Sequence, residues 1–404
     1  MKRGSDGTAA ARACLRAWWM LRQALSPVSA ARTVDDCVRR IGWVPTSGGP
    51  NVYLTLRARL PGVSREAIDR AAIDGTPLIE VPGRHARPPV LVPREDMAFA
   101  LRLHRMSYDR HVAAYVRRGE IDSDGIRRVS AAICRTLDEG PLPSADLRKR
   151  VRPADANVWI GALIDLSLRG VIRRFPAGAR LDSPKYLYEL LHPDDRPNLE
   201  AEGDAAAVEQ RAVERFLRWH GPATLAELCA WSEMTKKAAR DALNALGATT
   251  VAIPGWSDEG WLLADDLRAW QAYGDDADHQ VALLPYRDPF IAARRGPAAL
   301  TDSADATVLD GGKTPVAIAD VTVLHHHTVV CGGEVVGVWE YDPKRRAIVT
   351  RVWKKDRGLK SSIEKAAEDT GHFIREQLGD ARLSAVDPPA ARARRLAFCR
   401  GASS

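Results

Sequence analysis

Two clusters of positively charged residues carry the clearest chemistry in this sequence. The clusters lie at 148–152 and 236–240, and their basic members are Arg148, Lys149, Arg150, Arg152, Lys236, Lys237 and Arg240. Lys and Arg side chains within a helical turn or two of one another can contact the phosphates of a nucleic acid, which positions a protein on a duplex without reading its bases. The alternative is an exposed, solvated helix face. The repeat described below favours DNA contact.

A third basic group occupies a predicted hairpin. Arg84, His85 and Arg87 lie between two apolar segments, 76–81 and 89–93, that have the composition of β-strands. These side chains could enter a DNA groove from the tip of the hairpin, or they could form an exposed turn. The sequence leaves both interpretations open.

Three consecutive histidines, His325 to His327, invite interpretation as a metal site. On a β-strand only His325 and His327 would share a face, and the neighbouring sequence has no acidic or thiol residue at ligand spacing. We therefore expect strand histidines that face solvent or DNA phosphate, and we expect neither a metal nor another cofactor.

A repeated segment indicates which elements carry the basic residues. Residues 137–147 read LDEGPLPSADL and residues 217–228 read LRWHGPATLAEL, with the two glycines 81 positions apart. In each copy an apolar helix ends at Gly-Pro, and Ser144 or Thr224 is placed to cap the next helix, with Asp146 or Glu227 in its first turn. A basic third helix and β-branched strands are then expected. This order is typical of a winged helix, a fold that binds DNA.

The pattern divides the chain into four parts. We predict an α+β protein with three tandem winged-helix domains, at 1–120, 121–204 and 205–278, followed by a small C-terminal β-rich domain with a terminal helix at 279–404. The helices expected in the two repeated copies cover 124–137, 144–151, 157–169, 206–219, 224–231 and 235–246. The last part is expected to contain strands at 281–284, 317–324, 327–331, 335–340 and 347–353, closed by one amphipathic helix at 361–378.

The composition agrees with a polyanionic partner. The 404 residues carry a formal net charge of +7, and residues 145–180 hold eight Lys and Arg against three Asp. The six cysteines lie far apart, which is typical of reduced thiols. No stretch of 18 apolar residues occurs in the sequence. We therefore expect a cytoplasmic, nucleoid-associated protein without a membrane segment.

Three segments resemble the signatures of a known family. Residues 221–228 read GPATLAEL, residues 283–290 read LLPYRDPF and precede Arg294 and Arg295, and residues 335–339 read VVGVW. In this order they resemble the bacterial winged-helix DNA-binding family that includes the AlkZ-like and YcaQ-like DNA glycosylases. The resemblance spans almost the whole chain and implies three winged helices and a C-terminal β-domain that cradle a duplex. Members with assigned activity excise alkylated or crosslinked bases.

Two residues near these signatures have more than one interpretation. Asp288 could hold a turn before Pro289 through an Asx-type backbone hydrogen bond, or it could face the DNA cavity with Arg294. We favour the structural role, because phosphates repel a carboxylate that has no catalytic use. Trp43 could stack on an extruded base, but a Trp that follows Gly42 at the end of an apolar helix is more typical of a core.

The catalytic motif of the family is not matched. Active members carry Gln-x-Gln or Gln-x-Asp ahead of a helix whose final signature is matched here by residues 54–59, LTLRAR, and counting back places Pro45, Thr46 and Ser47 at the motif. Cleavage of an N-glycosidic bond needs a group that positions or deprotonates water and a polar wall that stabilises the oxocarbenium character of the sugar. Pro45 supplies neither, and the two hydroxyls are poor bases. The closest carboxylates in the sequence, Asp35 and Asp36, lie about ten residues upstream on a predicted helix.

The sequence therefore supports two functions. The absence of both Gln residues favours a protein that has a degenerate catalytic motif and binds duplex DNA that is damaged or distorted. The full-length resemblance favours an active glycosylase that excises alkylated or crosslinked purines. In both cases the partner is double-stranded DNA, no cofactor is needed, and three tandem units allow the chain to act as a monomer.

Overall fold

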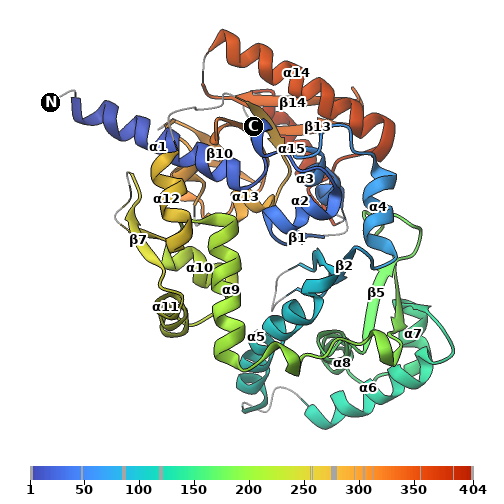
Figure 1. Ribbon diagram of the computed structural model, residues 1–404. Helices are drawn as coiled ribbons and strands as arrows, with labels where there is room; N and C mark the ends of the chain where they lie inside the picture. Colours follow the sequence, from blue (N-terminus) through green and yellow to red (C-terminus); the bar gives the residue numbers. More distant parts are fainter. Residues whose placement is uncertain are drawn as a thin grey trace. The chain divides into compact units, whose positions relative to one another are not determined.

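The protein folds into two compact units in the computed structural model (Figure 1). The structure describes residues 3–46, 49–83, 88–117, 122–254, 256, 258–273, 280–294, 296–303, 305–311, 313–354, 356–384 and 386–401. Unit 1 comprises Met1–Val44, Gly49–Ile68 and Val213–Ser404, and unit 2 comprises Pro45–Gly48 and Asp69–Ala212. Helices and sheets occur in both units, so the predicted α+β class is confirmed. The four-part division concerns smaller groups of elements and stays a prediction.

The first helices of the chain are α1 (Arg3–Arg22), α2 (Val34–Ile41), α3 (Asn51–Arg57) and α4 (Arg65–Ile73). α2 begins after Thr33, whose hydroxyl accepts a hydrogen bond from the backbone N–H of Asp36, and ends at Gly42 with a φ of +93°. A Cβ at position 42 would lie 2.9 Å from the ring of Trp219, so both the backbone angle and the available space require glycine. The resemblance implies a helix that ends in the signature at 54–59, but periodicity does not indicate α3, because residues 51–56 are all buried and show no amphipathic period.

The later repeated copy forms α9 (Ala205–His220), α10 (Leu225–Ser232), α11 (Lys236–Ala245), β7 (Thr249–Ala252) and β8 (Glu259–Leu262), followed by α12 (Ala264–Ala272). The predicted cap at Thr224 is confirmed. Its hydroxyl accepts a hydrogen bond from the backbone N–H of Glu227, and the Glu227 carboxylate accepts one from the backbone N–H of Thr224. This reciprocal capping box fixes the start of α10.

A four-stranded antiparallel sheet forms the C-terminal part of unit 1. Its order is β14 (Ala347–Val352), β13 (Glu334–Asp342), β12 (His327–Cys331) and β9 (Val281–Leu284), and β10 (Thr307–Asp310) pairs separately with β11 (Thr314–Ala317). The predicted strand at 317–324 is wrong, because β11 ends at Ala317. Ile318, Val321 and Leu324 are buried in one apolar cluster at a spacing of three, which is not the alternation of a strand.

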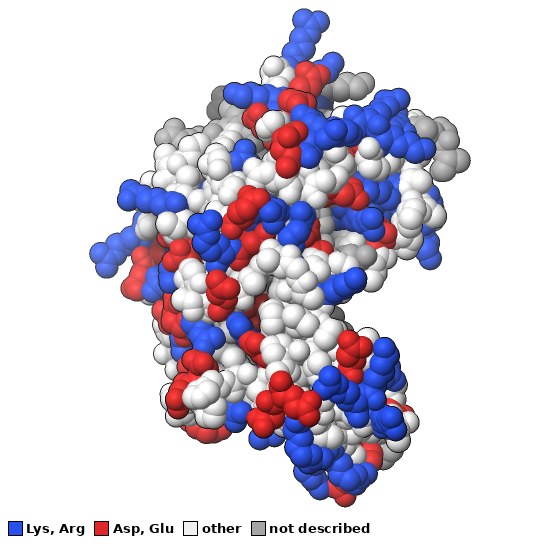
Figure 2. Space-filling model, turned by 90° about the vertical axis from the view of Figure 1, so that its right-hand side faces the viewer, with Lys and Arg blue, Asp and Glu red and all other residues white. Residues whose placement is uncertain are grey.

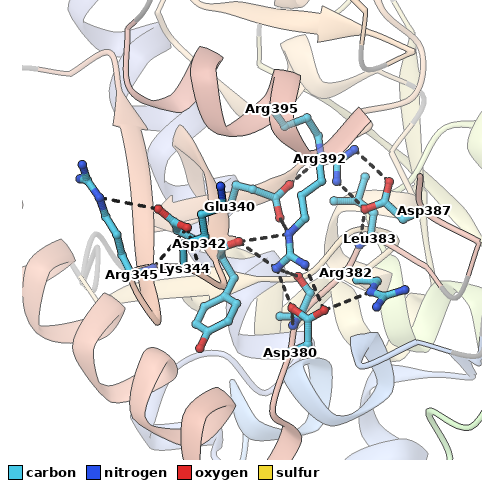
Figure 3. A network of polar contacts seen from close by, with 12 residues as sticks. Glu340, Asp342, Lys344, Arg345, Asp380, Arg382, Leu383, Asp387, Arg392 and Arg395 are labelled. Carbon is cyan, nitrogen blue, oxygen red and sulfur yellow. Dashed lines mark hydrogen bonds and ion pairs between the residues drawn. The ribbon is translucent and has the colours of Figure 1, made fainter. Parts of the chain in front are cut away.

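Two helices, not one, close the chain. α14 (Arg357–Phe373) continues as a π-helical turn at Ile374–Leu378, and α15 (Pro389–Cys399) follows, so the expectation of a single final helix is wrong. Figure 3 shows how charged groups attach α15 to the sheet. Arg395 Nε lies 2.6 Å from Glu340 Oε2, and Arg392 donates a hydrogen bond of 2.7 Å to Asp380. Burial raises the pKa of Glu340 to about 7 against the influence of Arg395.

Unit 2 contains β2 (Leu78–Val81), β3 (Val90–Pro93), α5 (Met97–Arg117), α6 (Ser123–Leu137), β4 (Leu142–Pro143), α7 (Ser144–Val151), α8 (Ala156–Leu168), β5 (Ile172–Pro176) and β6 (Tyr186–Leu190). One sheet has the order β4-β6-β5, and the other has the order β1-β3-β2, where β1 is Val44–Pro45. The core under the first sheet includes Ile133, Leu147, Trp159 and Leu163. The predicted cap at Ser144 is wrong, because Ser144 is the first helical residue and the N-cap, Pro143, has no side-chain hydrogen bond.

Short 3-10 helices occur at Pro27–Ser29, Arg94–Asp96, Pro193–Asp195, Glu200–Glu202, Pro297–Leu300 and Ile318–Asp320, and a four-residue helix, α13, covers Pro289–Ala292. No helix in the described part of the chain combines the length and hydrophobicity that crossing a bilayer requires.

Candidate functional site

The earlier basic cluster lies on the exposed side of α7. Leu147 is the buried residue of this helix, whereas Arg148, Lys149 and Arg150 are exposed. Arg152 ends the helix in the left-handed conformation with a φ of +51°. An open surface groove of about 610 Å³ is lined by Ser144, Ala145, Arg148, Lys149, Arg152, Pro153 and Trp159. Lys and Arg side chains gather on the lower part of the face shown in Figure 2.

Ion pairs leave much of this charge available. Lys149 lies 3.4 Å from Asp146 and Arg150 lies 2.8 Å from Glu139, both at side chains that are half exposed or more. Exposed pairs of this kind contribute little and exchange readily for a phosphate. Within the described part of the chain, Arg148 and Arg152 make no ion pair. The groove on α7 is therefore a cationic surface.

The expectation of a basic third helix is wrong for the earlier copy. α8 contains neither Lys nor Arg, and it begins at Asp155, whose carboxylate accepts hydrogen bonds from the backbone N–H groups of Asn157 and Val158. Trp159 and Leu163 are buried, whereas Ile160 is 52% exposed. In this copy the positive charge therefore lies on the second helix.

The later basic cluster lies on the third helix of its copy. Lys236, Lys237 and Arg240 are exposed on α11, while Ala239 and Leu243 on the same helix are buried. Lys237 Nζ lies 2.6 Å from Asp241, and this hydrogen bond raises the pKa of Lys237. α11 thus presents a charged face to solvent. The basic hairpin residues Arg84, His85 and Arg87 lie outside the described residues.

The segment that replaces the family's catalytic motif contacts a carboxylate that the sequence does not indicate. Thr46 is 1% exposed, and its hydroxyl donates a hydrogen bond to Glu80 on β2. Its backbone N–H donates to the carbonyl of Pro89 at 2.8 Å, which places the segment beside β3. Pro45 precedes it in β1, and Ser47 lies outside the described residues.

Asp35 and Asp36, the carboxylates nearest in the sequence, serve the first turn of α2. Asp35 accepts a hydrogen bond from Thr33, which lowers the pKa of Asp35, and Asp36 accepts one of 3.0 Å from the backbone N–H of Arg32. Negative charge at a helix N-terminus is stabilising. These two residues therefore have a structural explanation.

Glu80 forms an ion pair with Arg174, which lies on β5. Arg174 Nε lies 2.6 Å from Glu80 Oε1, and the Glu80 side chain is 9% exposed. Burial lowers the pKa of Arg174, but the charge and hydrogen bond of Glu80 together with the neighbouring Tyr186 and Tyr188 outweigh burial, and the net effect raises the pKa. The Arg174 guanidinium also lies over the ring of Tyr186, 4.2 Å from its centre. These contacts hold the Glu80 carboxylate in one orientation.

A cavity of about 270 Å³ opens beside this pair. Most of its walls are apolar, and its polar side chains are Glu80, Tyr108, Ser167, Arg173, Arg174 and Tyr188. Among the described residues that line the cavity, Glu80 is the only carboxylate. One signal in the sequence could have indicated Glu80, since it is the only charged residue within the predicted apolar strand 76–81. Its pairing with Thr46 and Arg174 depends on tertiary structure.

The other candidate residues have structural roles. Trp43 is 6% exposed and packs against Trp219 and Trp231, which confirms the core interpretation. Asp288 accepts the expected Asx-type hydrogen bond from the backbone N–H of Phe290 at 3.0 Å. It pairs with Arg59, not with Arg294, whose guanidinium donates to the carbonyl of His220 at 2.7 Å.

The expectation that the histidines face solvent or phosphate is wrong for two of the three. His326 and His327 are 1% and 0% exposed, and burial lowers the pKa of each. His327 Nδ1 accepts a hydrogen bond of 2.9 Å from the backbone N–H of Tyr286, and its ring stacks on Trp339 with centres 4.2 Å apart. Both therefore act as neutral core residues. Among the described residues, no group of three or more His, Cys, Asp or Glu is arranged to hold a metal ion.

The architecture is that of a DNA glycosylase. Streptomyces sahachiroi DNA glycosylase AlkZ aligns with 92% of this chain over 98% of its own length, with a TM-score of 0.68 and 19% sequence identity. The chain belongs to the AlkZ-like DNA glycosylase family, whose model matches residues 38–373. The resemblance noted in the sequence is thus confirmed. No curated protein matches the chain.

Proposed function

We propose that this chain binds duplex DNA through the basic surfaces of α7 and α11 and surveys it for damaged bases. The observation that carries this proposal is the exposure of two basic clusters on corresponding repeats, each opposite a buried apolar face. Phosphate contacts from such clusters supply most of the affinity for DNA without sequence preference. Membership of a DNA glycosylase family favours DNA over other polyanions.

Three winged helices are the arrangement we propose for this surface. The element orders α2-β1-α3-α4-β2-β3 and α6-β4-α7-α8-β5-β6 are the same, and α9-α10-α11-β7-β8 differs only in its first strand. That strand is reduced to one bridge, Ala223 with Trp261, at the place where Leu142 pairs with Tyr188 in the preceding copy. The elements from α2 to β3 follow the same order as those from α6 to β6, so we propose that the first repeat begins with α2.

Two functions are compatible with this interface. In one the protein binds DNA without excising a base, and in the other it excises the base. Absence of both motif glutamines supports the first. A specific observation favours the second, namely the carboxylate of Glu80 beside Thr46. We propose further that the chain acts as a monomer at the nucleoid, since tandem repeats within one chain need no partner subunit to span a duplex.

Gel-shift titration of a duplex oligonucleotide with the purified full chain tests the binding proposal. We expect a shifted complex at low salt that weakens steeply as salt is added. Absence of a complex at any salt concentration, with light scattering showing a folded monomer, would exclude the proposed function.

A further inference from the structure

We propose that Glu80 is the catalytic carboxylate of this chain and that it acts on a purine extruded into the cavity beside it. This inference rests on the proposed function, since the base must come from a bound duplex. Of the described residues on the wall of the 270 Å³ cavity, Glu80 alone carries a carboxylate, and its side chain is 9% exposed. Its carboxylate also pairs with Arg174 and accepts the hydroxyl hydrogen bond of Thr46, so a charged group is held in place at a largely apolar wall.

The size and lining of the cavity suit one base. Small-molecule sites begin at about 300 Å³, and this cavity is slightly smaller. It therefore has room for one fused purine ring system and not for two bases. Tyr188 and Tyr108 offer aromatic surfaces, and Leu163 and Leu168 supply apolar ones. Flipped bases are held by stacking between aromatic and apolar side chains. A purine alkylated at a ring nitrogen such as N7 carries positive charge, which a carboxylate attracts.

The contacts of Glu80 hold its carboxylate in one orientation. Thr46 donates its hydroxyl hydrogen to Oε2, and Arg174 Nε donates to Oε1 at 2.6 Å. Each carboxylate oxygen has a second lone pair, so each can still accept a hydrogen bond from water. Thr46 and Arg174 are therefore positioning residues for a carboxylate that binds the nucleophile.

The loop that carries Thr46 differs from its counterparts in the other repeats. β4 leads directly into α7 at Ser144, and Thr224 directly caps α10. In the first repeat, β1 ends at Pro45 and α3 begins only at Asn51, with Pro50 as its N-cap. Thr46 therefore caps no helix, and its hydroxyl donates to Glu80.

The reaction that this arrangement supports is hydrolysis of the N-glycosidic bond. The C1′–N bond breaks and its electron pair moves to the purine, which neutralises the positive charge of the alkylated ring. The carboxylate stabilises the oxocarbenium character of the sugar. Water oxygen forms the new bond to C1′, and its proton passes to Glu80 and then to solvent. The products are a free neutral base and an abasic deoxyribose.

Single-turnover excision tests this role. The substrate is a duplex oligonucleotide with one 7-methylguanine, and strand scission by alkali reports base loss above the rate without protein. We expect Glu80→Gln to slow excision by about 100-fold or more while duplex affinity stays within about twofold. Thr46→Val should slow it by about tenfold, and Thr46→Ser should restore it. A merely structural threonine would not show this rescue by a hydroxyl.

Glu189→Gln is the matched control. Glu189 lies on β6 and pairs with Arg173 as Glu80 pairs with Arg174, but it does not line the cavity. We expect excision by Glu189→Gln at the wild-type rate. Wild-type excision in Glu80→Gln, or duplex binding without any excision by the wild-type chain, would overturn the inference and leave the binding proposal intact. If Glu80→Gln fails to fold, equal rates for Thr46→Val and the wild-type chain would overturn it.

Discussion

Arg59 and Asp288 form a doubly hydrogen-bonded ion pair in the core of unit 1. The two guanidinium nitrogens each lie 2.7 Å from a carboxylate oxygen, and both side chains are 0% exposed. Asp288 belongs to the LLPYRDPF segment and Arg59 to the LTLRAR segment. Two signatures that are 229 positions apart therefore meet in one structural contact.

Removal of one partner of this pair should destabilise the fold strongly. Asp288→Ala leaves the Arg59 charge buried and unpaired, so we expect the free energy of unfolding in urea to fall by about 3–5 kcal/mol. Glu139→Ala, which breaks the exposed pair with Arg150, is the control and should leave it nearly unchanged. Similar small losses in both variants would contradict the structural role of Asp288.

The two repeated hydroxyl residues should differ in their contribution to stability. Thr224→Ala removes a capping box, and we expect a loss of about 1 kcal/mol. Ser144→Ala removes no cap, so its effect should stay within about 0.5 kcal/mol. Denaturant unfolding followed by circular dichroism measures both. A larger loss for Ser144→Ala than for Thr224→Ala would show that the caps are assigned to the wrong copy.

The carboxyl group of Glu340 should make stability depend on pH. Burial raises its pKa to about 7 in the fold, whereas the unfolded chain has the ordinary value of about 4.3. Between these values the folded state binds more protons than the unfolded state, so its contribution to stability is greatest below about pH 4 and falls as pH rises towards 7. Above pH 7 the contribution no longer changes.

Glu340→Gln isolates this contribution from that of the buried histidines. Between pH 4 and pH 7.5, the free energy of unfolding of the wild-type chain should fall by roughly 3 kcal/mol relative to that of the variant. The variant keeps the shape of the group beside Arg395 and cannot titrate. A difference that stays constant with pH would show that Glu340 has the same pKa in the folded and unfolded states, which contradicts the effect of burial.

Local patterns were sufficient to predict most helices of the two repeated copies. α7 begins and ends at the predicted residues, because Gly140 and Pro141 stop the preceding helix and Leu147 marks the buried side. β9 and β12 also have the predicted bounds. By contrast, α3 is buried on nearly all sides, and α15 buries Arg392 and Arg395 together with Phe398 and Cys399, so neither shows a clear amphipathic pattern. Periodicity identifies an element only when one of its faces meets solvent.

The candidate site was harder to predict, because long-range contacts create it. Glu80 lies 34 positions from Thr46 and 94 positions from Arg174, and the packing of elements from two different sheets brings the three together. His326 and His327 were expected at a surface, yet the register of β12 with β13 places His327 opposite Trp339 in the core. A residue type indicates what chemistry is available, whereas its burial and neighbours decide whether that chemistry is used.

The salt dependence of duplex binding tests the proposed DNA interface most directly. The logarithm of the binding constant should fall linearly with the logarithm of salt concentration, by about 0.9 for each neutralised phosphate. We predict that two double variants flatten this slope by one to two units, at about 0.9 per lost contact. One carries Lys236→Ala and Lys237→Ala, and the other carries Arg148→Ala and Arg152→Ala. Arg127→Ala with Arg128→Ala removes equal charge from the exposed side of α6 and should leave the slope nearly unchanged. Equal slopes for the wild-type chain and both interface variants would contradict the proposed DNA interface.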